Sequence, residues 1–178
     1  MLFRSLGTTA SGGPLFSEAV DELLFFDGSE EGYHRADSLS VAAAVDRLEN
    51  EDVDAAFVYI GDADEVSHAT GTYAPEYRSA IEAADVLVGR LVAAIQARPT
   101  YADEDWLILV STDHGRDEEG GHGGDSDQER TIFFLAHGPS VVRAPIETPP
   151  NILDVAVTSP LHLAVQIYPP STRTASVW

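Results

Sequence analysis

The sequence predicts an α/β protein in which a mostly parallel sheet carries helices on both of its faces. Short apolar runs, rich in β-branched and aromatic residues, alternate along the chain with longer segments whose apolar residues recur every three or four positions. Strands that are apolar throughout are typical of parallel sheets buried between two helical layers. The 178 residues, of which 44% are hydrophobic, are enough for one core, and this length favours a single domain.

The amino-terminal part of the chain gives the weakest signals. Residues 1–20 are rich in Gly, Ser and Thr without a sustained period, so we expect a loop there, and residues 23–26 could form a short strand. Residues 37–50 predict a helix, with apolar side chains at spacings of three and four and with Asp37 or Ser38 as its N-cap. This helix is the first well-defined element.

The middle of the chain holds the strongest patterns. Residues 55–60 form a continuous apolar run that predicts a buried central strand, and residues 61–73 follow as a polar loop. Residues 75–97 predict the longest helix, because apolar residues recur on one face and Pro75 suits the first turn. Residues 106–110 predict a second buried strand. This strand-helix-strand order indicates the parallel sheet.

The carboxyl-terminal part predicts one more strand and one more helix. Residues 131–136 are an apolar run typical of a strand, residues 145–150 are a linker, and residues 151–167 suit a helix that Pro160 kinks or splits. The chain accordingly divides into three parts: a poorly structured amino-terminal segment or remnant of an inserted region over residues 1–36, the α/β domain over residues 37–168, and a tail over residues 169–178.

The charge composition excludes several classes of partner. The formal net charge is -20, and the 10 basic residues are all Arg. Such a surface repels nucleic acids and anionic membranes, so we expect neither as a partner. The simplest explanation of so many carboxylates is solubility, with metal ligands accounting for only a few of them.

The sequence contains no Cys, which excludes disulfides, thiolate zinc sites and a cysteine nucleophile. Any metal must therefore bind to His, Asp or Glu. No apolar run approaches the ~20 residues of a membrane span, and residues 1–14 lack the apolar centre of a secretory signal. We predict neither a transmembrane segment nor a signal peptide, and the sequence does not assign a compartment.

The loop after the strand at residues 55–60 carries the first candidate metal ligands. Asp64 and His68 are four residues apart, so on a helical turn their side chains would point the same way, and Asp62 is close enough to compete. In an acidic chain such a spacing also arises by chance in a solvated loop. Its position directly after a buried strand favours a ligand role, because ligands bind at the carboxyl ends of strands in such sheets.

The second buried strand, at residues 106–110, leads into the other candidate ligands. Asp113 and His114 are neighbours, and both can reach one ion only if the backbone turns, which Gly115 permits. The alternative is an Asp-His pair that caps or hydrogen-bonds. His122 follows between two pairs of glycines, whose ordering is costly, and it is the residue type best suited to bind metals at neutral pH. The glycine loop therefore indicates a site rather than a spacer.

Other titratable residues give no comparable signal. Three further histidines lie outside these motifs, and we expect them to be surface residues or to be satisfied within the core: His34, His137 and His162. Three acidic residues beyond the glycine loop would either orient the ligand imidazoles or form a solvated patch, and the acidic composition favours the patch: Asp125, Asp127 and Glu129.

Four motifs together carry a resemblance to a known family. They are Phe-Val-Tyr-Ile-Gly-Asp-Ala-Asp-Glu-Val-Ser-His at 57–68, Ser-Thr-Asp-His-Gly at 111–115, Gly-His-Gly at 121–123 and Glu-Arg-Thr-Ile at 129–132. With them the chain resembles the alkaline phosphatase superfamily and, more narrowly, its type I phosphodiesterase and nucleotide pyrophosphatase branch. The resemblance runs from about residue 37 to about residue 163, and the motifs are specific together rather than singly.

The resemblance implies a fold of the alkaline phosphatase type with two divalent metal ions. By the family's pattern, Asp64, His68 and His122 hold the first ion, and Asp113 and His114 hold the second. Zinc is the usual occupant in the phosphodiesterase branch and manganese in the related mutases, and nitrogen and carboxylate donors suit both. We therefore expect zinc, with manganese as the alternative.

One part of the family's pattern has no counterpart in this sequence. Family members carry another Asp ligand on the first strand and a Ser or Thr nucleophile at a helix start, both upstream of the motifs above. Thr8, Thr9 and Ser11 lie in a glycine-rich stretch with no preceding strand or Asp. The chain therefore resembles the carboxyl-terminal part of the catalytic domain, without its amino-terminal strands and without its nucleophile.

The function that the resemblance implies is a metal-dependent hydrolase of small-molecule phosphate esters, of the phosphodiesterase or nucleotide pyrophosphatase type, truncated here and inactive alone. In the complete enzyme two ions about 4 Å apart would clamp the phosphoryl group while a phosphorylated Ser or Thr forms and is hydrolysed. One alternative is a phosphoglycerate mutase-like or sulfatase-like member of the superfamily. Another is a non-catalytic metal-binding remnant or interaction domain. A sheet edge left uncovered by the missing strands would favour a homodimer.

Overall fold

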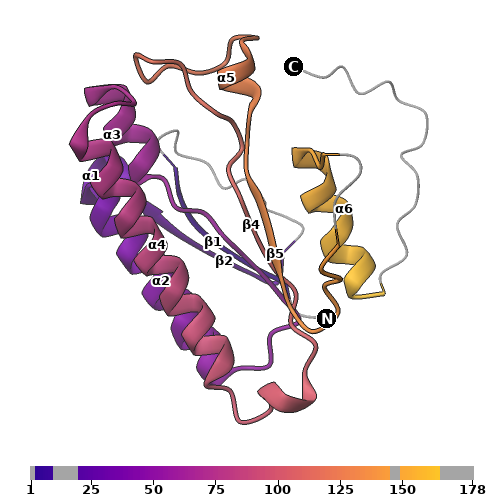
Figure 1. The fold of residues 1–178 in the computed structure, drawn as a ribbon. Helices are drawn as coiled ribbons and strands as arrows, with labels where there is room; N and C mark the ends of the chain where they lie inside the picture. The colour runs from indigo at the N-terminus through magenta and orange to yellow at the C-terminus, as the bar shows by residue number, and fades with distance from the viewer. Residues whose placement is uncertain (1–2, 10–19, 145–148, 165–178) are drawn as a thin grey trace. The chain divides into compact units, whose positions relative to one another are not determined.

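A three-stranded sheet and its helices belong to the first of two units in the computed structural model, which describes residues 3–9, 20–144 and 149–164 (Figure 1). The first unit comprises Met1–Glu104 and His114–Thr131, and the second comprises Asp105–Asp113 and Ile132–Trp178. Each unit is compact in itself.

The sheet of the first unit has the strand order β2-β1-β3, and its strands pair in parallel. These strands are β1 (Phe3–Thr9), β2 (Glu22–Asp27) and β3 (Ala55–Val58). In the register of the central strand, Leu6 pairs with Leu24 on one side and with Val58 on the other. The prediction of a loop at residues 1–20 is wrong for β1, which has no apolar run to mark it. Its pairing partners lie far away along the chain, where local composition does not reveal them.

Two strands, β1 and β2, precede the first candidate ligands, whereas the absence of the family's own amino-terminal strands stays a prediction. Both β1 and β2 fall within residues 1–36, which the sequence assigns to a poorly structured segment, and the short helix α1 spans Gly28–Glu31. Thr8 and Thr9 end β1 rather than lying in a loop. Ser11, residues 145–148 of the predicted linker and the predicted tail lie outside the described residues.

Two long helices build the core of the first unit. α2 (Tyr33–Asn50) packs against all three strands, and α4 (Pro75–Gln96) packs on α2 and on the short α3 (Asp62–Thr70) (Figure 1). The buried apolar residues come from α2, from α4 and from the turn before β3: Ala36, Val41, Ala44, Leu48, Val53, Ala80, Leu87, Ala94 and Ile95. The helix predicted at residues 75–97 is thus confirmed as α4. No helix in the described part of the chain is long and apolar enough to cross a membrane.

α2 begins earlier than the sequence predicts, and Asp37 is not its N-cap. Gly32, with a φ of 80°, separates α2 from α1, so that Asp37 lies inside the helix, where the residue is only 1% exposed. The loop predicted over residues 61–73 contains α3 instead. This helix is rich in carboxylates, Ser, Thr and His, so it lacks the apolar stripe by which a helix is recognised.

The second unit contains an antiparallel pair of strands, β4 (Ile108–Ser111) and β5 (Phe134–His137), and the helix α6 (Ile152–His162), which continues past Pro160. The predicted mixture of helices and strands is confirmed, but a single, mostly parallel sheet does not form in the described residues, because β4 and β5 pair with each other. Parallel pairing needs a long crossover, usually a helix. Between β4 and β5 the structure describes only the one-turn helix α5 (Asp127–Arg130).

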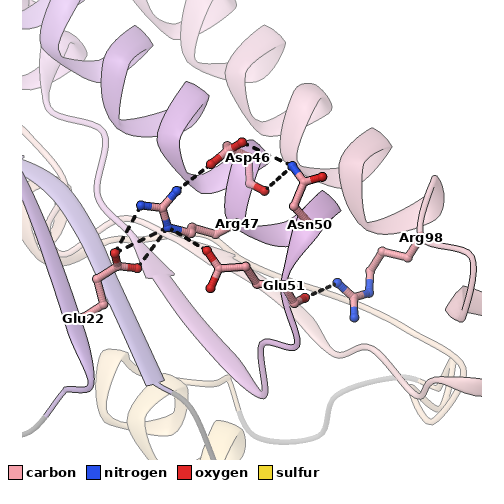
Figure 2. Close-up of polar contacts among 6 residues, drawn as sticks. All are labelled: Glu22, Asp46, Arg47, Asn50, Glu51 and Arg98. Atoms are coloured by element: carbon pink, nitrogen blue, oxygen red, sulfur yellow. Dashed lines mark hydrogen bonds and ion pairs between the residues drawn. The ribbon is translucent and has the colours of Figure 1, made fainter.

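Two arginines at the ends of the long helices form ion pairs and hydrogen bonds with neighbouring segments of the first unit. Figure 2 shows Arg47 of α2 between Glu22 of β2 and Glu51, each at 3.2 Å. Arg98, which follows α4, has a side chain that is 8% exposed and pairs with Glu104 at 2.8 Å. Its guanidinium also donates to two main-chain carbonyls at the end of α2, that of Glu51 among them. The hydrogen bonds from Arg98 to Glu104 raise the pKa of the guanidinium.

Replacing Arg98 by Ala is expected to destabilise the first unit by about 2–4 kcal/mol, because it removes the charged partner of Glu104 and a donor to two main-chain carbonyls at the end of α2. Arg35→Ala is the control. Arg35 forms an exposed pair with Glu31 one turn away, at 2.9 Å, and its loss should change stability by less than about 0.5 kcal/mol. Urea unfolding measures both variants, and equal midpoints would contradict the prediction.

Candidate metal centre

α3 carries the first two candidate ligands on one side. Asp64 and His68 are four residues apart along this helix, so their side chains project from successive turns. His68 Nε2 lies 3.7 Å from Asp64 Oδ2. Asp62, the competing carboxylate, instead lies 3.3 Å from Nδ1 of His34. The helix therefore places Asp64 beside His68 and gives Asp62 a different partner.

The loop from residue 114 to residue 124 brings two more imidazoles to the same carboxylate. Nε2 of His114 and Nε2 of His122 each lie 3.7 Å from Asp64 Oδ1. Their rings stack with centroids 3.7 Å apart, and His122 Nε2 is 3.1 Å from His68 Nε2. Ligand atoms of Asp64, His114 and His122 all lie within 4.8 Å of one another. Four of the five predicted ligands thus gather in the first unit.

The remaining candidates have other settings. Asp113 is exposed, follows β4 and belongs to the second unit, so its role as a ligand stays a prediction. His34 and His137 are exposed. A ring nitrogen of His162 lies 2.6 Å from the main-chain carbonyl oxygen of Asp105. None of these three histidines joins the cluster.

The main chain sets the orientation of His114. Its Nδ1 lies 2.9 Å from the carbonyl oxygen of Gly115, so Nδ1 carries a hydrogen and donates it. In the neutral imidazole Nε2 then carries a lone pair, and this is the atom that faces Asp64. A lone pair facing a carboxylate is unfavourable unless positive charge lies between them. The Arg116 guanidinium, which contacts Asp64 Oδ1, supplies such charge, and a metal ion bound at the cluster would supply it as well.

The loop from residue 114 to residue 124 packs against α3 through close backbone contacts. Gly120 has a φ of 89°, and a Cβ at this position would clash with the carbonyl oxygen of Ser67. Asp117 closes the turn, because its carboxylate accepts the Gly121 amide at 2.6 Å and its own amide donates to the Gly121 carbonyl at 3.0 Å. Glycine is therefore required at position 120, and the loop rests on the helix that carries the first two ligands.

Glu129 holds the other end of the loop. Its main-chain carbonyl accepts the Gly115 amide at 2.7 Å. Its carboxylate accepts the Ser126 hydroxyl at 2.5 Å and the Gly124 amide at 2.8 Å, and these hydrogen bonds, that of Ser126 first, lower the pKa of Glu129. Among the three acidic residues considered as orienting groups, Glu129 therefore organises the loop backbone, while the other two are exposed.

Arg116 belongs to the cluster, although sequence reasoning does not single it out. Its side chain is 7% exposed, its guanidinium contacts Asp64 Oδ1, and its Nη1 donates to the Gly120 carbonyl at 2.6 Å. Burial lowers the pKa of Arg116. Asp64 Oδ1 is buried and accepts no hydrogen bond of normal geometry from the described residues, so ion pairs balance its charge. A single basic residue in an acidic loop is the signal that points to Arg116.

The cluster has the donors and the spacings of a site for a divalent cation. A tetrahedral zinc ion with ligands at about 2.0–2.1 Å has neighbouring donors about 3.3 Å apart. In the cluster, His122 Nε2 lies 3.1 Å from His68 Nε2, each of the three imidazoles lies 3.7 Å from an Asp64 oxygen, and the ligand atoms of Asp64, His114 and His122 lie within 4.8 Å of one another. Three imidazoles and one carboxylate suit zinc or manganese better than calcium or magnesium, which prefer oxygen donors.

Comparison with known proteins shows that the chain is similar to members of one enzyme family. The model of the type I phosphodiesterase / nucleotide pyrophosphatase family matches residues 15–124, which include all five predicted ligands. Two relatives are catalytic subunits of GPI ethanolamine phosphate transferase 3. The one from Mus musculus is 24% identical over 166 residues, which cover 92% of this chain and 14% of the relative. The one from Homo sapiens is 29% identical over 102 residues, which cover 56% of this chain and 9% of the relative.

Proposed function

The chain belongs to the type I phosphodiesterase / nucleotide pyrophosphatase family, and on this basis we propose that it takes part in the metal-dependent hydrolysis or transfer of phosphate esters. The observation that supports the proposal is the convergence of Asp64, His114 and His122, whose ligand atoms all lie within 4.8 Å of one another. His68 adjoins this group, with its Nε2 3.1 Å from His122 Nε2 and 3.7 Å from Asp64 Oδ2. A divalent ion held there would polarise a phosphoryl group and lower the pKa of an attacking hydroxyl or water.

In this proposal four residues of the cluster are metal ligands, and two further interactions support them. Asp64 and His68 would hold the ion from α3, and His114 and His122 would hold it from the loop. The hydrogen bond from His114 Nδ1 to the main chain keeps Nε2 available as a ligand. Arg116, in contact with Asp64, favours the ionised form of that carboxylate, which is the form that binds metals.

Zinc is the proposed occupant, with manganese as the alternative, because the donor set accepts both. A second ion, which the family resemblance assigns to Asp113 and His114, stays a prediction, and so does the source of the Ser or Thr nucleophile. The substrate would be a small-molecule phosphate ester. The chain spans a small part of the two transferase subunits, yet its similarity to them favours transfer of a substituted phosphoryl group as a second candidate reaction.

Zinc binding and turnover test the proposal separately. We expect at least one zinc ion per chain in a titration against a chromophoric chelator, and His137→Ala, an exposed histidine outside the cluster, should bind equally well. Zinc-dependent cleavage of bis(4-nitrophenyl) phosphate, abolished by EDTA, would support the phosphodiesterase reaction. Zinc binding without turnover would favour the alternative of a non-catalytic metal-binding domain. A chain that binds neither zinc nor manganese would contradict the proposal.

The proposed assembly is a homodimer that pairs an outer strand of the sheet with its counterpart in a second copy. In the described part of the first unit, β2 and β3 flank β1, and each pairs with β1 on one side. Sheet edges of this kind favour association through main-chain hydrogen bonds. Size-exclusion chromatography that gives a monomer would exclude this assembly.

A further inference from the structure

Asp37 caps α3 from a different helix. It lies in α2, is 1% exposed, and accepts the amide of Gly61 at 2.9 Å and the amide of Asp62 at 2.8 Å, one on each carboxylate oxygen. Gly61 is the N-cap of α3 and has no side chain with which to cap the helix. A residue of α2 therefore supplies acceptors that the start of α3 needs.

A carboxylate is an unfavourable choice for this place on electrostatic grounds. Burying a carboxylate costs free energy unless it is well hydrogen-bonded, and the first turn of α3 already carries Asp62, Asp64 and Glu65. The helix dipole and the two amide hydrogen bonds favour negative charge at this end of the helix and oppose these costs. A neutral Ser or Asn would satisfy one amide without adding charge. What the carboxylate of Asp37 adds is a two-point attachment, since each oxygen holds a different amide.

This attachment fixes the helix that carries two of the candidate ligands. Asp64 lies in the first turn of α3 and His68 one turn later, and the whole helix has only 9 residues. A shift at the start of so short a helix is carried to both side chains. His114 and His122 come from a separate loop, so the cluster forms only if α3 is held at the right place. Metal sites tolerate deviations of only about 0.2 Å in ligand distance.

We propose that Asp37 is a positioning residue of the metal centre, which holds the start of α3 so that Asp64 and His68 meet the imidazoles of the loop; this inference rests on the proposed function. Asp37 accepts hydrogen bonds from main-chain amides, and it acts on the ligands through the helix. The effect should therefore be seen in metal affinity and coordination as well as in stability.

Asp37→Asn keeps the size of the side chain but turns an NH₂ group toward one of the two amides. Zinc affinity, measured by competition with a chromophoric chelator, should fall about 10–100-fold, the range found for residues that orient ligands. The visible spectrum of the cobalt-loaded chain should change as well, because it reports coordination geometry. Ser40→Ala, 0% exposed on the same helix, is the matched control and should leave both readouts unchanged. A folded Asp37→Asn chain with unchanged affinity and spectrum would overturn the inference.

A second measurement uses the unaltered chain and does not depend on whether Asp37→Asn folds. If Asp37 couples the start of α3 to the metal centre, saturating zinc should slow hydrogen exchange at the amides of Gly61 and Asp62 at least about tenfold more than at Leu87 of α4. Equal slowing at all three amides would overturn the inference. A chain without zinc affinity would overturn the proposed function as well, whereas zinc binding that is intact in Asp37→Asn would overturn the inference alone.

Discussion

Asp64→Asn is expected to lower the zinc affinity of the chain by more than about 100-fold, because residues that only orient a ligand already cost about 10–100-fold when changed. The Asp64 carboxylate is the shared partner of the cluster, 3.7 Å from Nε2 of each of His68, His114 and His122. The amide would remove the one negative charge among the four donors. It would also leave the buried guanidinium of Arg116 against a neutral group. Competition with a chromophoric chelator measures the loss.

Asp127→Asn is the matched control for this change. It makes the same chemical substitution on the exposed side of α5, and zinc affinity should stay at that of the unaltered chain. Circular dichroism of both variants separates loss of a ligand from loss of the fold. If folded Asp64→Asn binds zinc as tightly as Asp127→Asn, the carboxylate is not a ligand and the proposed metal centre is wrong.

Gly120→Ala is expected to abolish zinc binding by a different route. The new Cβ would clash with the carbonyl oxygen of Ser67, and a φ of 89° strains any side chain larger than that of glycine. The loop would have to leave α3 and would take His114 and His122 away from Asp64. Strain of this kind costs about 1–3 kcal/mol, so urea unfolding in EDTA should show destabilisation even without metal.

Gly89→Ala controls for the substitution itself. Gly89 lies within α4, and an added Cβ there would meet no atom within 4 Å. Replacing a helical glycine by alanine should stabilise the chain by about 0.5–1 kcal/mol and leave zinc affinity unchanged. The two Gly→Ala variants are therefore expected to differ in the sign of their effect on stability. A Gly120→Ala chain that is as stable as the unaltered protein and binds zinc would contradict the close contact between loop and helix.

The elements that could be predicted are those whose signal is local. α4 is marked by an apolar stripe over many turns, and β3 by a continuous apolar run, so both were accessible from the sequence. α3 was not, because its polar side chains provide candidate ligands rather than core residues. β1 could not be predicted from the sequence either. It has few apolar residues, and its pairing with β2 on one side and β3 on the other defines it as a strand. The antiparallel pairing of β4 with β5 is likewise a matter of long-range contacts.

The residues of the candidate site likewise fall into those that a local sequence signal reveals and those that it does not. Asp64 and His68 could be found from their spacing, and His122 from its glycines, because these signals lie within a few residues. The contact of Arg116 with Asp64 and that of Asp37 with the amides of Gly61 and Asp62 could not, since these partners lie far away along the chain. For Asp37 the local rule even gave a competing answer, because an Asp near the start of an apolar pattern is a good N-cap. Only the structure shows that Asp37 caps α3 rather than the helix in which it lies.

α2 buries a carboxylate and a hydroxyl, those of Asp37 and Ser40, in a stripe that is otherwise apolar. With apolar residues alone, such a helix could slide by one turn and exchange one hydrophobic contact for another. Sliding would strip Asp37 of the amides of Gly61 and Asp62 and leave an uncompensated charge in the interior. The native alignment of α2 satisfies this carboxylate at the start of α3, and Asp37 thereby favours the native packing over a shifted one.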